Sequence, residues 1–335
     1  MNPEVSVIVP ARNEEACLGE CLRSLVAQTG VSFEIIVVDD GSADRTREIA
    51  ESFAGVRVIA APALPSGWTG KNNAMVAGAV VARGEWLLFT DADTVHLPGS
   101  LARAVEEAER EHADLLSYSP EQVVVTFAER VVMPVVFAEL AAEYPPAKVR
   151  DANSGIVAAN GQYILVRHAA YEAAGGHAGV AREILEDVAL AKAFRRAGFR
   201  VYFRYGADAV RTRMYRNWAQ VREGWTKNLA LLFPQAASRA LLVFMWWLFA
   251  WLTLPAPIAA IALFIRIRAA NFRMGTTLAA MAFGPPVFAY LVLRSWRQHA
   301  MRTVSWKGRT YSQASGGASE IWTPRTENRE LRTEN

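Results

Sequence analysis

The stretch that decides the fold of this 335-residue chain reads Glu85-Trp86-Leu87-Leu88-Phe89-Thr90-Asp91-Ala92-Asp93. Its first part is a short apolar run, which is typical of a buried strand. Two aspartates follow the run, one residue apart, and Leu97-Pro98-Gly99 then indicates a turn. We therefore predict a strand over residues 85–90 that presents two carboxylates at its carboxyl end.

Two upstream stretches have the same form. Val5-Ser6-Val7-Ile8-Val9-Pro10 is an apolar run ended by proline, and the run over 33–38 ends in Asp39-Asp40-Gly41-Ser42. Helical spacing and turn residues predict helices over 14–27, 44–53 and 72–82, with another strand over 57–60. Strands that alternate with helices of this length favour an α/β fold with a doubly wound, mostly parallel sheet.

Acidic pairs thus follow two predicted strands, Asp39-Asp40 in one case and Asp91 with Asp93 in the other. Open α/β sheets bind ligands at the carboxyl ends of their strands. Aspartate also caps helices, and capping is enough to explain Asp44. Two acidic pairs at two strand ends favour a ligand site.

The Asp91-Ala92-Asp93 turn has the chemistry of a site for a hard cation. Two carboxylates one residue apart can share Mg²⁺ or Mn²⁺, and water and phosphate oxygens would fill the remaining positions. Such a cation would neutralise the charge that builds on a leaving diphosphate.

The apolar residues, 52% of the chain, are concentrated after residue 240. Neither 240–265 nor 274–293 contains a charge, and about 20 apolar residues span a bilayer core. We expect two transmembrane or membrane-embedded helical segments within 240–294. Pro255 and Pro257 would kink the first segment or turn it back.

Basic residues are more numerous beside these segments than between them. The intervening loop would carry Arg266, Arg268 and Arg273, against Arg222, Lys227, Arg239, Arg294, Arg297, Arg302, Lys307 and Arg309 in the flanks. The positive-inside rule then places both flanks on the cytoplasmic side of the cell's inner (plasma) membrane. Met1-Asn2-Pro3-Glu4 lacks the features of a signal peptide, so the first domain would stay in the cytosol.

Four motifs, in order and spacing, resemble the family 2 glycosyltransferases with the GT-A fold over roughly residues 4–230. They are VSVIVPARNEE at 5–15, VVDDGS at 37–42, DAD at 91–93 and Glu186-Asp187. PSGWTGKNNA at 65–74 and WKGRTY at 306–311 are similar to the membrane-bound branch that glycosylates lipids, including hopanoid-associated and carotenoid-type transferases.

The resemblance implies a metal-dependent, membrane-anchored hexosyltransferase that moves a sugar from a nucleotide-diphosphate sugar to a hydroxyl or phosphate of a lipid-like acceptor, with inversion. Its catalytic domain would cover 1–235, the membrane segments 240–294, and a cytoplasmic tail with a disordered end 295–335. The tail is polar after Ser312.

The resemblance also implies roles residue by residue. Asp187 would be the general base, which must be ionised at neutral pH, and an aspartate needs no unusual pKa for that. Glu186 beside it is a second catalytic candidate. The other candidates are Pro10, Arg12, Glu14, Asp39, Asp40, Lys71, Asp91 and Arg309 for the donor; Gly161, Gln162 and Trp225 for a donor or acceptor loop; and Asp93 with Asp91 for the metal.

Three alternatives stay open. His177 is either functional or a satisfied surface histidine. Residues 126–144 form either a core helix or a helix lying in the membrane interface. Arg309 would stabilise the leaving diphosphate or contact a lipid headgroup.

Other function classes fit the sequence less well. Processive relatives carry Gln-x-x-Arg-Trp where this chain has Gln220-Val221-Arg222-Glu223-Gly224-Trp225, which weakens the case for a polysaccharide synthase. An inactive membrane scaffold would be expected to have lost Asp93 or Asp187. A net charge of +3 without a basic stripe argues against nucleic acid. Cys17 and Cys21, four apart on a predicted helix, favour a structural role over a disulfide or zinc site.

Overall fold

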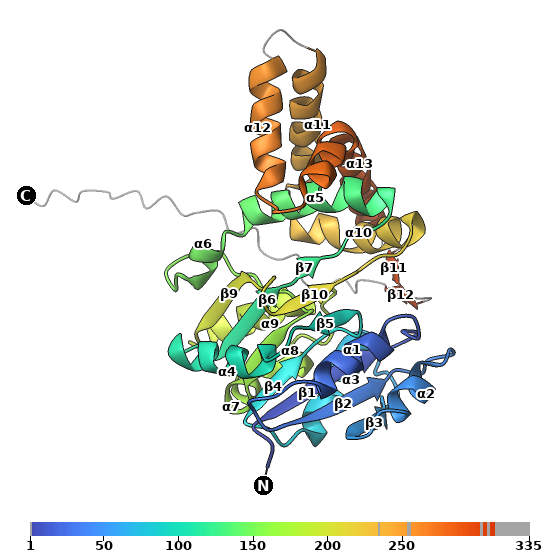
Figure 1. Cartoon of the computed structure of the whole chain (residues 1–335), viewed down its shortest axis with the longest axis vertical. Helices are drawn as coiled ribbons and strands as arrows, with labels where there is room; N and C mark the ends of the chain where they lie inside the picture. The colour runs from blue at the N-terminus through green and yellow to red at the C-terminus, as the bar shows by residue number, and fades with distance from the viewer. Residues whose placement is uncertain (1, 234, 253–255, 302–303, 307–308, 312–335) are drawn as a thin grey trace, which may run out of the picture.

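The structure, a computed structural model, describes residues 2–233, 235–252, 256–301, 304–306 and 309–311. An α/β part forms one end of the molecule, and a group of helices covers it at the other end (Figure 1). We call these helices the helical roof. They are α5 (Phe127–Glu143), α10 (Trp218–Leu232), α11 (Ala236–Leu252), α12 (Ala256–Arg268) and α13 (Met274–Ala300).

A seven-stranded sheet in the order β3-β2-β1-β4-β8-β6-β9 forms the centre of the α/β part. Its β8 runs antiparallel to both neighbours, and all other adjacent strands are parallel. The predicted doubly wound, mostly parallel sheet is confirmed. The strands are β1 (Val5–Ala11), β2 (Phe33–Asp39), β3 (Val56–Ala60), β4 (Trp86–Phe89), β6 (Leu115–Ser119), β8 (Ile164–Arg167) and β9 (Val201–Tyr205).

Helices cover both faces of this sheet, which is why its strands are nearly continuous apolar runs. Val7 and Val9 of β1 pack in one core with α1 and α4, whereas Ile8 packs in another with α3 and α9. Gly78 lets α3 approach closely, because a Cβ there would lie 2.5 Å from Ile8 Cγ2. The remaining helices are α1 (Leu18–Val26), α2 (Thr46–Glu51), α3 (Gly70–Val81), α4 (Ser100–Arg110), α6 (Pro146–Arg150), α7 (His168–Ala173), α8 (Gly176–Gly179) and α9 (Glu186–Arg196).

A small second sheet, in the order β5-β10-β7, fixes the turn after β4. Its strands are β5 (Thr94–His96), β7 (Glu121–Gln122) and β10 (Val210–Thr212), and β5 pairs antiparallel with β10. The two aspartates of interest therefore lie between a strand of the large sheet and a strand of the small one. This arrangement limits the freedom of both carboxylates.

Helix α5 is a core helix of the roof, so the structure favours the first of the two interpretations of residues 126–144. Val131, Val132, Val135 and Val136 are buried, in one core with residues of α10 to α13. A capping box begins the helix: the Thr126 hydroxyl accepts the Glu129 N–H, and the Glu129 carboxylate accepts the Thr126 N–H.

The apolar stretch 240–265 is not one straight span. It falls on two helices, α11 and α12, which lie side by side and stand above α5 (Figure 1). The chain therefore turns back within this stretch, which is one of the two outcomes predicted from its prolines. Arg266 and Arg268 were expected in a loop between two segments, and this is wrong. They belong to the last turn of α12, where Arg266 pairs with Glu139 of α5.

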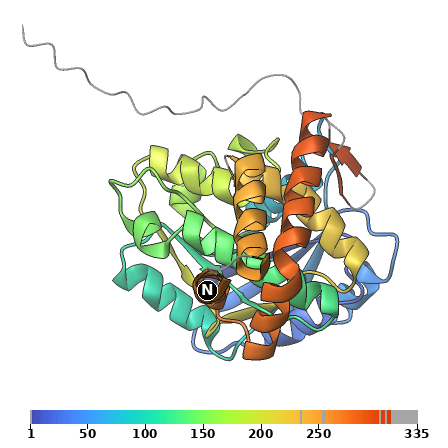
Figure 2. The same ribbon diagram turned by 90° about the horizontal axis from the view of Figure 1, so that it is seen from above.

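Within the described ranges, α13 is the one single helix long and apolar enough to cross a membrane. The pair α10 and α11 passes the same test together but is bent by 111°. Seen from above, α12 and α13 lie over the α/β part (Figure 2). The predicted disordered end of the tail, after Ser312, lies outside the described residues.

Candidate active site

A cavity of about 590 Å³ lies where β1, β2 and β4 end, beneath α5 and α10. It brings together almost all of the predicted site residues. They are Pro10, Arg12, Glu14, Asp40, Lys71, Asp91, Asp93, Gly161, Gln162, Glu186, Asp187 and Trp225. Segments up to 215 residues apart in the sequence therefore meet at the sheet edge that the strand pattern indicated.

Of the other two residues predicted to bind the donor, one does not line the cavity, and the side chain of the other is not described. The Asp39 carboxylate is buried and accepts the Ser42 N–H at 3.0 Å, which stabilises the turn after β2, and Asp39 does not line the cavity. Arg309 lies in β12 (Arg309–Tyr311), which pairs with β11 (Val304–Trp306), but its side chain lies outside the described part of the chain.

Close contacts fix the part of the cavity nearest β1 and β2. Arg12 Nη1 donates to the Asp40 carbonyl at 2.6 Å and lies 3.9 Å from the Asp40 carboxylate. The backbone N–H of Glu14 donates to the Thr46 hydroxyl at 2.7 Å, which joins the loop after β1 to α2. These contacts tie the ends of β1 and β2 together.

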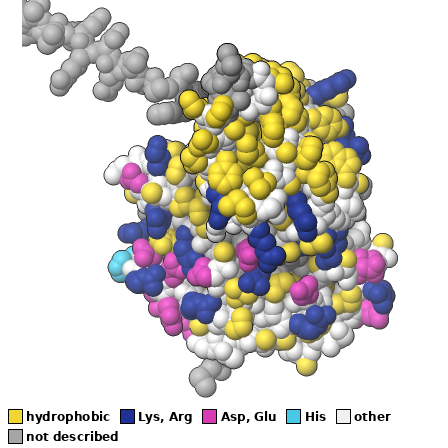
Figure 3. Space-filling model, turned by 45° about the horizontal axis from the view of Figure 1, so that its top comes forward, with side chains coloured by type: hydrophobic (Ala, Val, Ile, Leu, Met, Phe, Trp, Pro, Cys, Tyr) yellow, Lys and Arg dark blue, Asp and Glu magenta, His cyan; other side chains and the backbone are white. Residues whose placement is uncertain are grey.

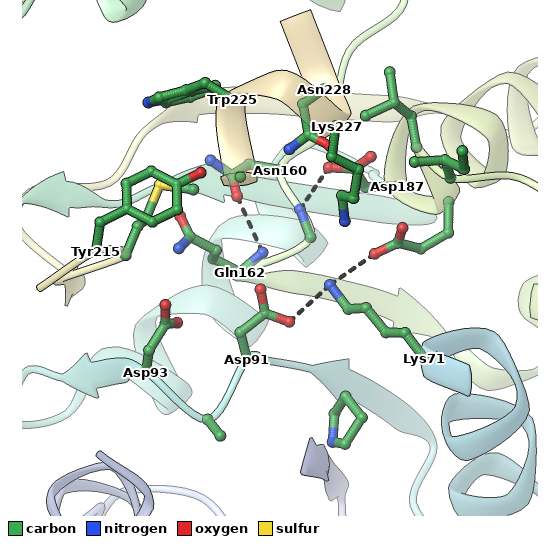
Figure 4. Close-up of a pocket in the computed structure, with 18 of the residues that line it drawn as sticks. Lys71, Asp91, Asp93, Asn160, Gln162, Asp187, Tyr215, Trp225, Lys227 and Asn228 are labelled. Carbon is green, nitrogen blue, oxygen red and sulfur yellow. Dashed lines mark hydrogen bonds and ion pairs between the residues drawn. The ribbon is translucent and has the colours of Figure 1, made fainter. Parts of the chain in front are cut away.

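Lys71 joins two acidic groups from distant segments. Its Nζ lies 2.7 Å from Asp91 Oδ1 and 2.6 Å from Glu186 Oε1 (Figure 4). Burial alone would lower the pKa of Lys71, but the charges of Asp91 and Glu186 outweigh it and raise that pKa. Lys71 is therefore a permanent cation at the centre of the cavity.

The first turn of α3 holds Lys71 in place. Thr69 caps the helix by accepting the Asn72 N–H, and the Asn72 amide donates to the Val180 and Ala181 carbonyls. The helix start is thereby fixed to the segment that leads to α9 and its two acidic residues.

Glu186 and Asp187 begin α9, where the helix dipole favours negative charge. Asp187 Oδ2 accepts the Gly161 N–H at 2.9 Å, and Oδ1 accepts the Val188 N–H at 2.8 Å. Burial, with the neighbouring charge of Glu186, raises the pKa of Asp187 to about 6. For Glu186, burial would raise the pKa, but Lys71 outweighs it and lowers that pKa.

Asp187 could act as a base with an ordinary pKa, but its surroundings raise that pKa. The pKa values of the two neighbouring carboxyl groups therefore differ. Glu186 stays ionised through its contact with Lys71, while Asp187 exchanges its proton near neutral pH. A carboxylate with that pKa is a stronger proton acceptor than an ordinary aspartate and is still mostly ionised at pH 7. The pair thus combines a fixed counter-charge with a titrating group.

Gly161 lets its loop come close to these side chains. A Cβ at this position would lie 3.2 Å from Lys71 Nζ and 3.3 Å from Glu186 Oε1. The adjacent Gln162 donates from its amide to the Thr212 hydroxyl at 3.0 Å, and its carbonyl accepts the Thr90 hydroxyl at 2.8 Å. The loop is thereby fixed to both sheets.

Asp91 and Asp93 both direct their carboxylates into the cavity (Figure 4). The Thr94 hydroxyl donates to the Asp91 carbonyl at 2.7 Å and holds the turn. The described residues contain no cluster of three or more His, Cys, Asp or Glu side chains that suits a metal ion. Two carboxylates fit a hard cation that takes its other ligands from phosphate and water, as Mg²⁺ commonly does.

One side of the cavity is apolar. We call it the apolar wing, and it consists of Phe137, Leu140, Tyr144, Phe203 and Leu232. The Tyr144 hydroxyl donates to the Leu232 carbonyl at 2.5 Å, which joins the ends of α5 and α10. Trp225 meets the ring of Phe137 edge to face, with centroids 6.1 Å apart, so aromatic and charged side chains line the same cavity.

Some cavity residues escaped the sequence analysis. The sequence places Lys227 among the charges that flank the apolar segments, whereas in the structure it lines the cavity from α10. Burial lowers the pKa of Lys227, although the nearby Glu186 acts in the opposite direction. Arg213 also lines the cavity, with Nε 3.0 Å from Glu129 Oε1. Both lie close in sequence to Trp225, but no motif marked them.

His177 is neither a surface histidine nor a cavity residue. It is fully buried, bonds the Tyr171 hydroxyl at 3.1 Å and packs on Phe89, and burial lowers its pKa to about 3. Cys17 and Cys21 are not joined by a disulfide, and the buried Cys21 thiol lies 3.8 Å from the Asp91 carbonyl oxygen.

The chain is similar to known glycosyltransferases in sequence and in fold. Residues 6–131 match the family described as Glycosyl transferase family 2. The chain is 27% identical over 340 residues to 4,4'-diaponeurosporenoate glycosyltransferase of Staphylococcus aureus (strain USA300), across 92% of this chain and 88% of that protein.

Among solved structures, the chain is similar to a mannosyltransferase from Pyrobaculum calidifontis determined in complex with GDP-Man and Mn²⁺. The TM-score is 0.53 and the identity 20%, across 90% of this chain and 88% of that one. This likeness shows the fold alone and confirms the expected GT-A architecture.

Proposed function

We propose that this chain, which its match over residues 6–131 identifies as a glycosyltransferase of family 2, transfers a sugar from a nucleotide-diphosphate sugar to a lipid-like acceptor. The observation that supports this function most strongly is the group of charged side chains in the cavity. Lys71 contacts Asp91 and Glu186 at 2.7 and 2.6 Å, with Asp187 next in sequence and the apolar wing in the same cavity.

The donor would lie along the strand ends. Arg12, Asp40 and the backbone after Pro10 line the part of the cavity nearest β1 and β2, which suits the nucleoside. Asp91 and Asp93 would hold Mg²⁺ or Mn²⁺ on the diphosphate, and that cation would supply Lewis-acid stabilisation of the leaving group. Lys71, with its raised pKa, keeps a positive charge beside the same carboxylates.

Asp187 is the proposed general base. The carboxylate would take the proton of the acceptor hydroxyl as that oxygen forms its bond to the anomeric carbon, and the bond to the diphosphate oxygen breaks with its electron pair. Attack from the side opposite the leaving group would invert the configuration. Two backbone N–H groups, from Gly161 and Val188, fix the orientation of the carboxylate.

The acceptor would lie in the apolar wing, which lines the same cavity as Asp187. A lipid-like acceptor is further supported by the relative from Staphylococcus aureus, which is named for 4,4'-diaponeurosporenoate. A carotenoid-type or hopanoid-type lipid fits such a surface, as does a polyprenyl phosphate. We propose that the reaction takes place at the cytoplasmic face of the inner membrane, because residues 224–319 carry basic side chains without an acidic one and that leaflet is anionic.

A polysaccharide synthase is the less favoured function. Glu223-Gly224 stands in place of the arginine of the processive motif, and a Cβ at Gly224 would lie 2.3 Å from the Tyr215 hydroxyl oxygen. The packing of Tyr215 on α10 leaves no room for a side chain there. A catalytically inactive scaffold is also less favoured, since Asp93 and Asp187 both line the cavity.

The test is transfer by the full-length protein in mixed vesicles. A panel of radiolabelled nucleotide sugars would be incubated with lipid extract and Mg²⁺, Mn²⁺ or EDTA, and organic-extractable label measured. We expect label with one donor only when a divalent cation is present, and its loss in Asp187→Asn. The exposed α9 variant Lys192→Met is the control and should transfer normally. Transfer that resists EDTA, or transfer only to water-soluble acceptors, would contradict the proposal.

A further inference from the structure

The helices α11 and α12 expose large apolar side chains over most of their length. Leu252, the last residue of α11, and Ile258, in the first turn of α12, are 73% and 74% exposed. Leu241, Trp246, Trp251 and Ile265 are exposed as well. Figure 3 shows these apolar side chains as a yellow cap on the roof, above a band of Lys and Arg. An exposed patch of this kind indicates an interaction surface.

The charge of this region identifies the partner. The sequence contains no Asp or Glu from residue 224 to residue 319. Over the same stretch it carries basic residues that include Arg268, Arg273, Arg294 and Arg297, besides Arg239 and Arg266, which pair with Glu139 of α5. An apolar cap bordered by cations and free of anions is complementary to a bilayer with anionic headgroups. A soluble protein partner would not need an apolar surface that is bordered by cations.

Each of the two helices is shorter than a typical bilayer core is thick. With a rise of about 1.5 Å per residue, the 17 residues of α11 extend about 25 Å and the 13 residues of α12 about 20 Å, less than the roughly 30 Å of a bilayer core. The two helices lie side by side, so α12 returns toward the level at which α11 began (Figure 1).

An ionic cluster fixes both ends of this hairpin at the same level. Glu139 of α5 is buried and pairs with Arg239 of α11 at 3.1 Å and with Arg266 of α12 at 2.5 Å. Arg239 belongs to the first turns of its helix and Arg266 to the last turn of the other. Since α5 also lines the cavity, the base of the hairpin lies on the side of the active site.

The long helix α13 lies along the roof and does not leave it. A Cβ at Gly284 would lie 2.5 Å from the Val131 carbonyl oxygen of α5, so the two backbones touch in the middle of α13. Farther along, the Ser295 hydroxyl accepts the Ala230 N–H of α10 at 2.9 Å, and His299 Nε2 donates to the Lys227 carbonyl at 2.8 Å. Both halves of α13 are thus held against helices that line the cavity.

We propose that the chain inserts into one leaflet of an anionic bilayer through the α11–α12 hairpin, from the side of the catalytic cavity, and that no helix crosses the membrane. In this arrangement α13 lies at the membrane surface, and the segment between α12 and α13 stays on the side of the α/β part. The proposal concerns insertion only and holds whether or not the sugar transfer is as proposed.

Cysteine labelling in sealed vesicles of known orientation tests this. In a Cys17→Ser background, which keeps the buried Cys21, three variants of the full chain with one added cysteine would be treated with a membrane-impermeant maleimide: Lys192→Cys on α9, Leu252→Cys at the hairpin end and Arg273→Cys before α13. The Cys17→Ser parent, without an added cysteine, is the control for Cys21. We expect the first and third to be labelled from the same face. Leu252→Cys should be labelled from neither face until detergent is added.

Each other labelling pattern would overturn the proposal. Labelling of Arg273→Cys from the face opposite Lys192→Cys would mean that a segment crosses. Labelling of Leu252→Cys from that opposite face would mean that the hairpin spans the bilayer, and labelling without detergent from the same face would mean that it lies in water.

A matched pair of charge variants adds a quantitative measurement. Leu252→Asp with Ile258→Asp should weaken flotation with vesicles of phosphatidylethanolamine and phosphatidylglycerol by on the order of tenfold or more. Val80→Asp, at an equally exposed valine on α3, should float as the wild type does. Unchanged unfolding midpoints for both proteins separate lost insertion from a lost fold. Equal flotation of the hairpin variant and the wild type would contradict the proposal.

Discussion

Replacing Lys71 with methionine removes a side chain that contacts both Asp91 and Glu186. The Asp91 contact is between side chains that are 30% and 27% exposed, so solvent screens it and its contribution is near that of a surface pair, about 0–1 kcal/mol. The Glu186 carboxylate is only 9% exposed, and removing the partner of a buried charge costs about 3–5 kcal/mol. We expect Lys71→Met to lose about 2–4 kcal/mol in the free energy of unfolding, because Lys71 itself is partly exposed.

The same change should shift the pH dependence of activity. The charge of Lys71 lowers the pKa of Asp187, against the larger effects of burial and of Glu186 that raise it to about 6. The base acts in its ionised form, so activity is lost as the pH falls through that pKa. Without Lys71 the acid limb of kcat/KM should move upward by about 1–2 pH units, since one unit corresponds to about 1.4 kcal/mol of electrostatic interaction.

Two measurements check this reasoning. Urea unfolding gives the loss of stability, and initial transfer rates between pH 5 and 9 give the acid limb. Lys71→Arg should retain most of the wild-type limb because it keeps the charge, and Lys192→Met should match the wild type in both assays. An acid limb in Lys71→Met that coincides with the wild-type limb, in a folded protein, would refute the electrostatic link between Lys71 and Asp187.

Further variants probe other parts of the account. Asp187→Asn should lower kcat by about 10²–10⁴-fold and abolish the acid limb near pH 6, with donor affinity by calorimetry little changed. Asp93→Ala should remove the dependence of donor binding on Mn²⁺, seen as equal calorimetric affinity with and without EDTA. Gly224→Ala should cost about 1–3 kcal/mol in urea unfolding, because its Cβ would overlap Tyr215. Thr126→Ala, which breaks the capping box of α5, should cost about 1 kcal/mol in the same assay.

The sheet and its ligand edge were predictable because they depend on local signals. The apolar runs at residues 5–10 and 85–90 read as strands since both faces of the sheet are covered, and the polar residues that end them fall at one edge. The small strand β5 was missed. Three residues are too few for a recognisable alternation, and Thr94–His96 is a strand only because β10 pairs with it.

The electrostatics of the site could not be predicted in the same way. The pKa of Asp187 depends on burial and on the distances among Lys71, Glu186 and Asp187, which come from α3 and α9 and meet only in the folded chain. Lys227 looked like a membrane-flanking charge because no motif contains it. Its place in the cavity follows from the packing of α10 beneath α13.

The path of the apolar stretch 240–265 could not be predicted from the sequence either. An uncharged stretch of 26 residues fits one tilted span or two shorter helices equally well, and composition cannot distinguish them. The contact that decides is between Glu139 and Arg266, 127 residues apart, which brings the end of α12 back to α5. Sequence reasoning assigned Arg266 to a loop because it ends an apolar run.

The most direct test of the account is transfer of labelled sugar to lipid by wild type and Asp187→Asn side by side, with donor affinity measured in both. The account predicts cation-dependent label in the lipid fraction for the wild type, and retained donor binding without transfer for Asp187→Asn. Transfer at the wild-type rate by Asp187→Asn would contradict the assignment of the base, and with it the central claim about how this cavity works.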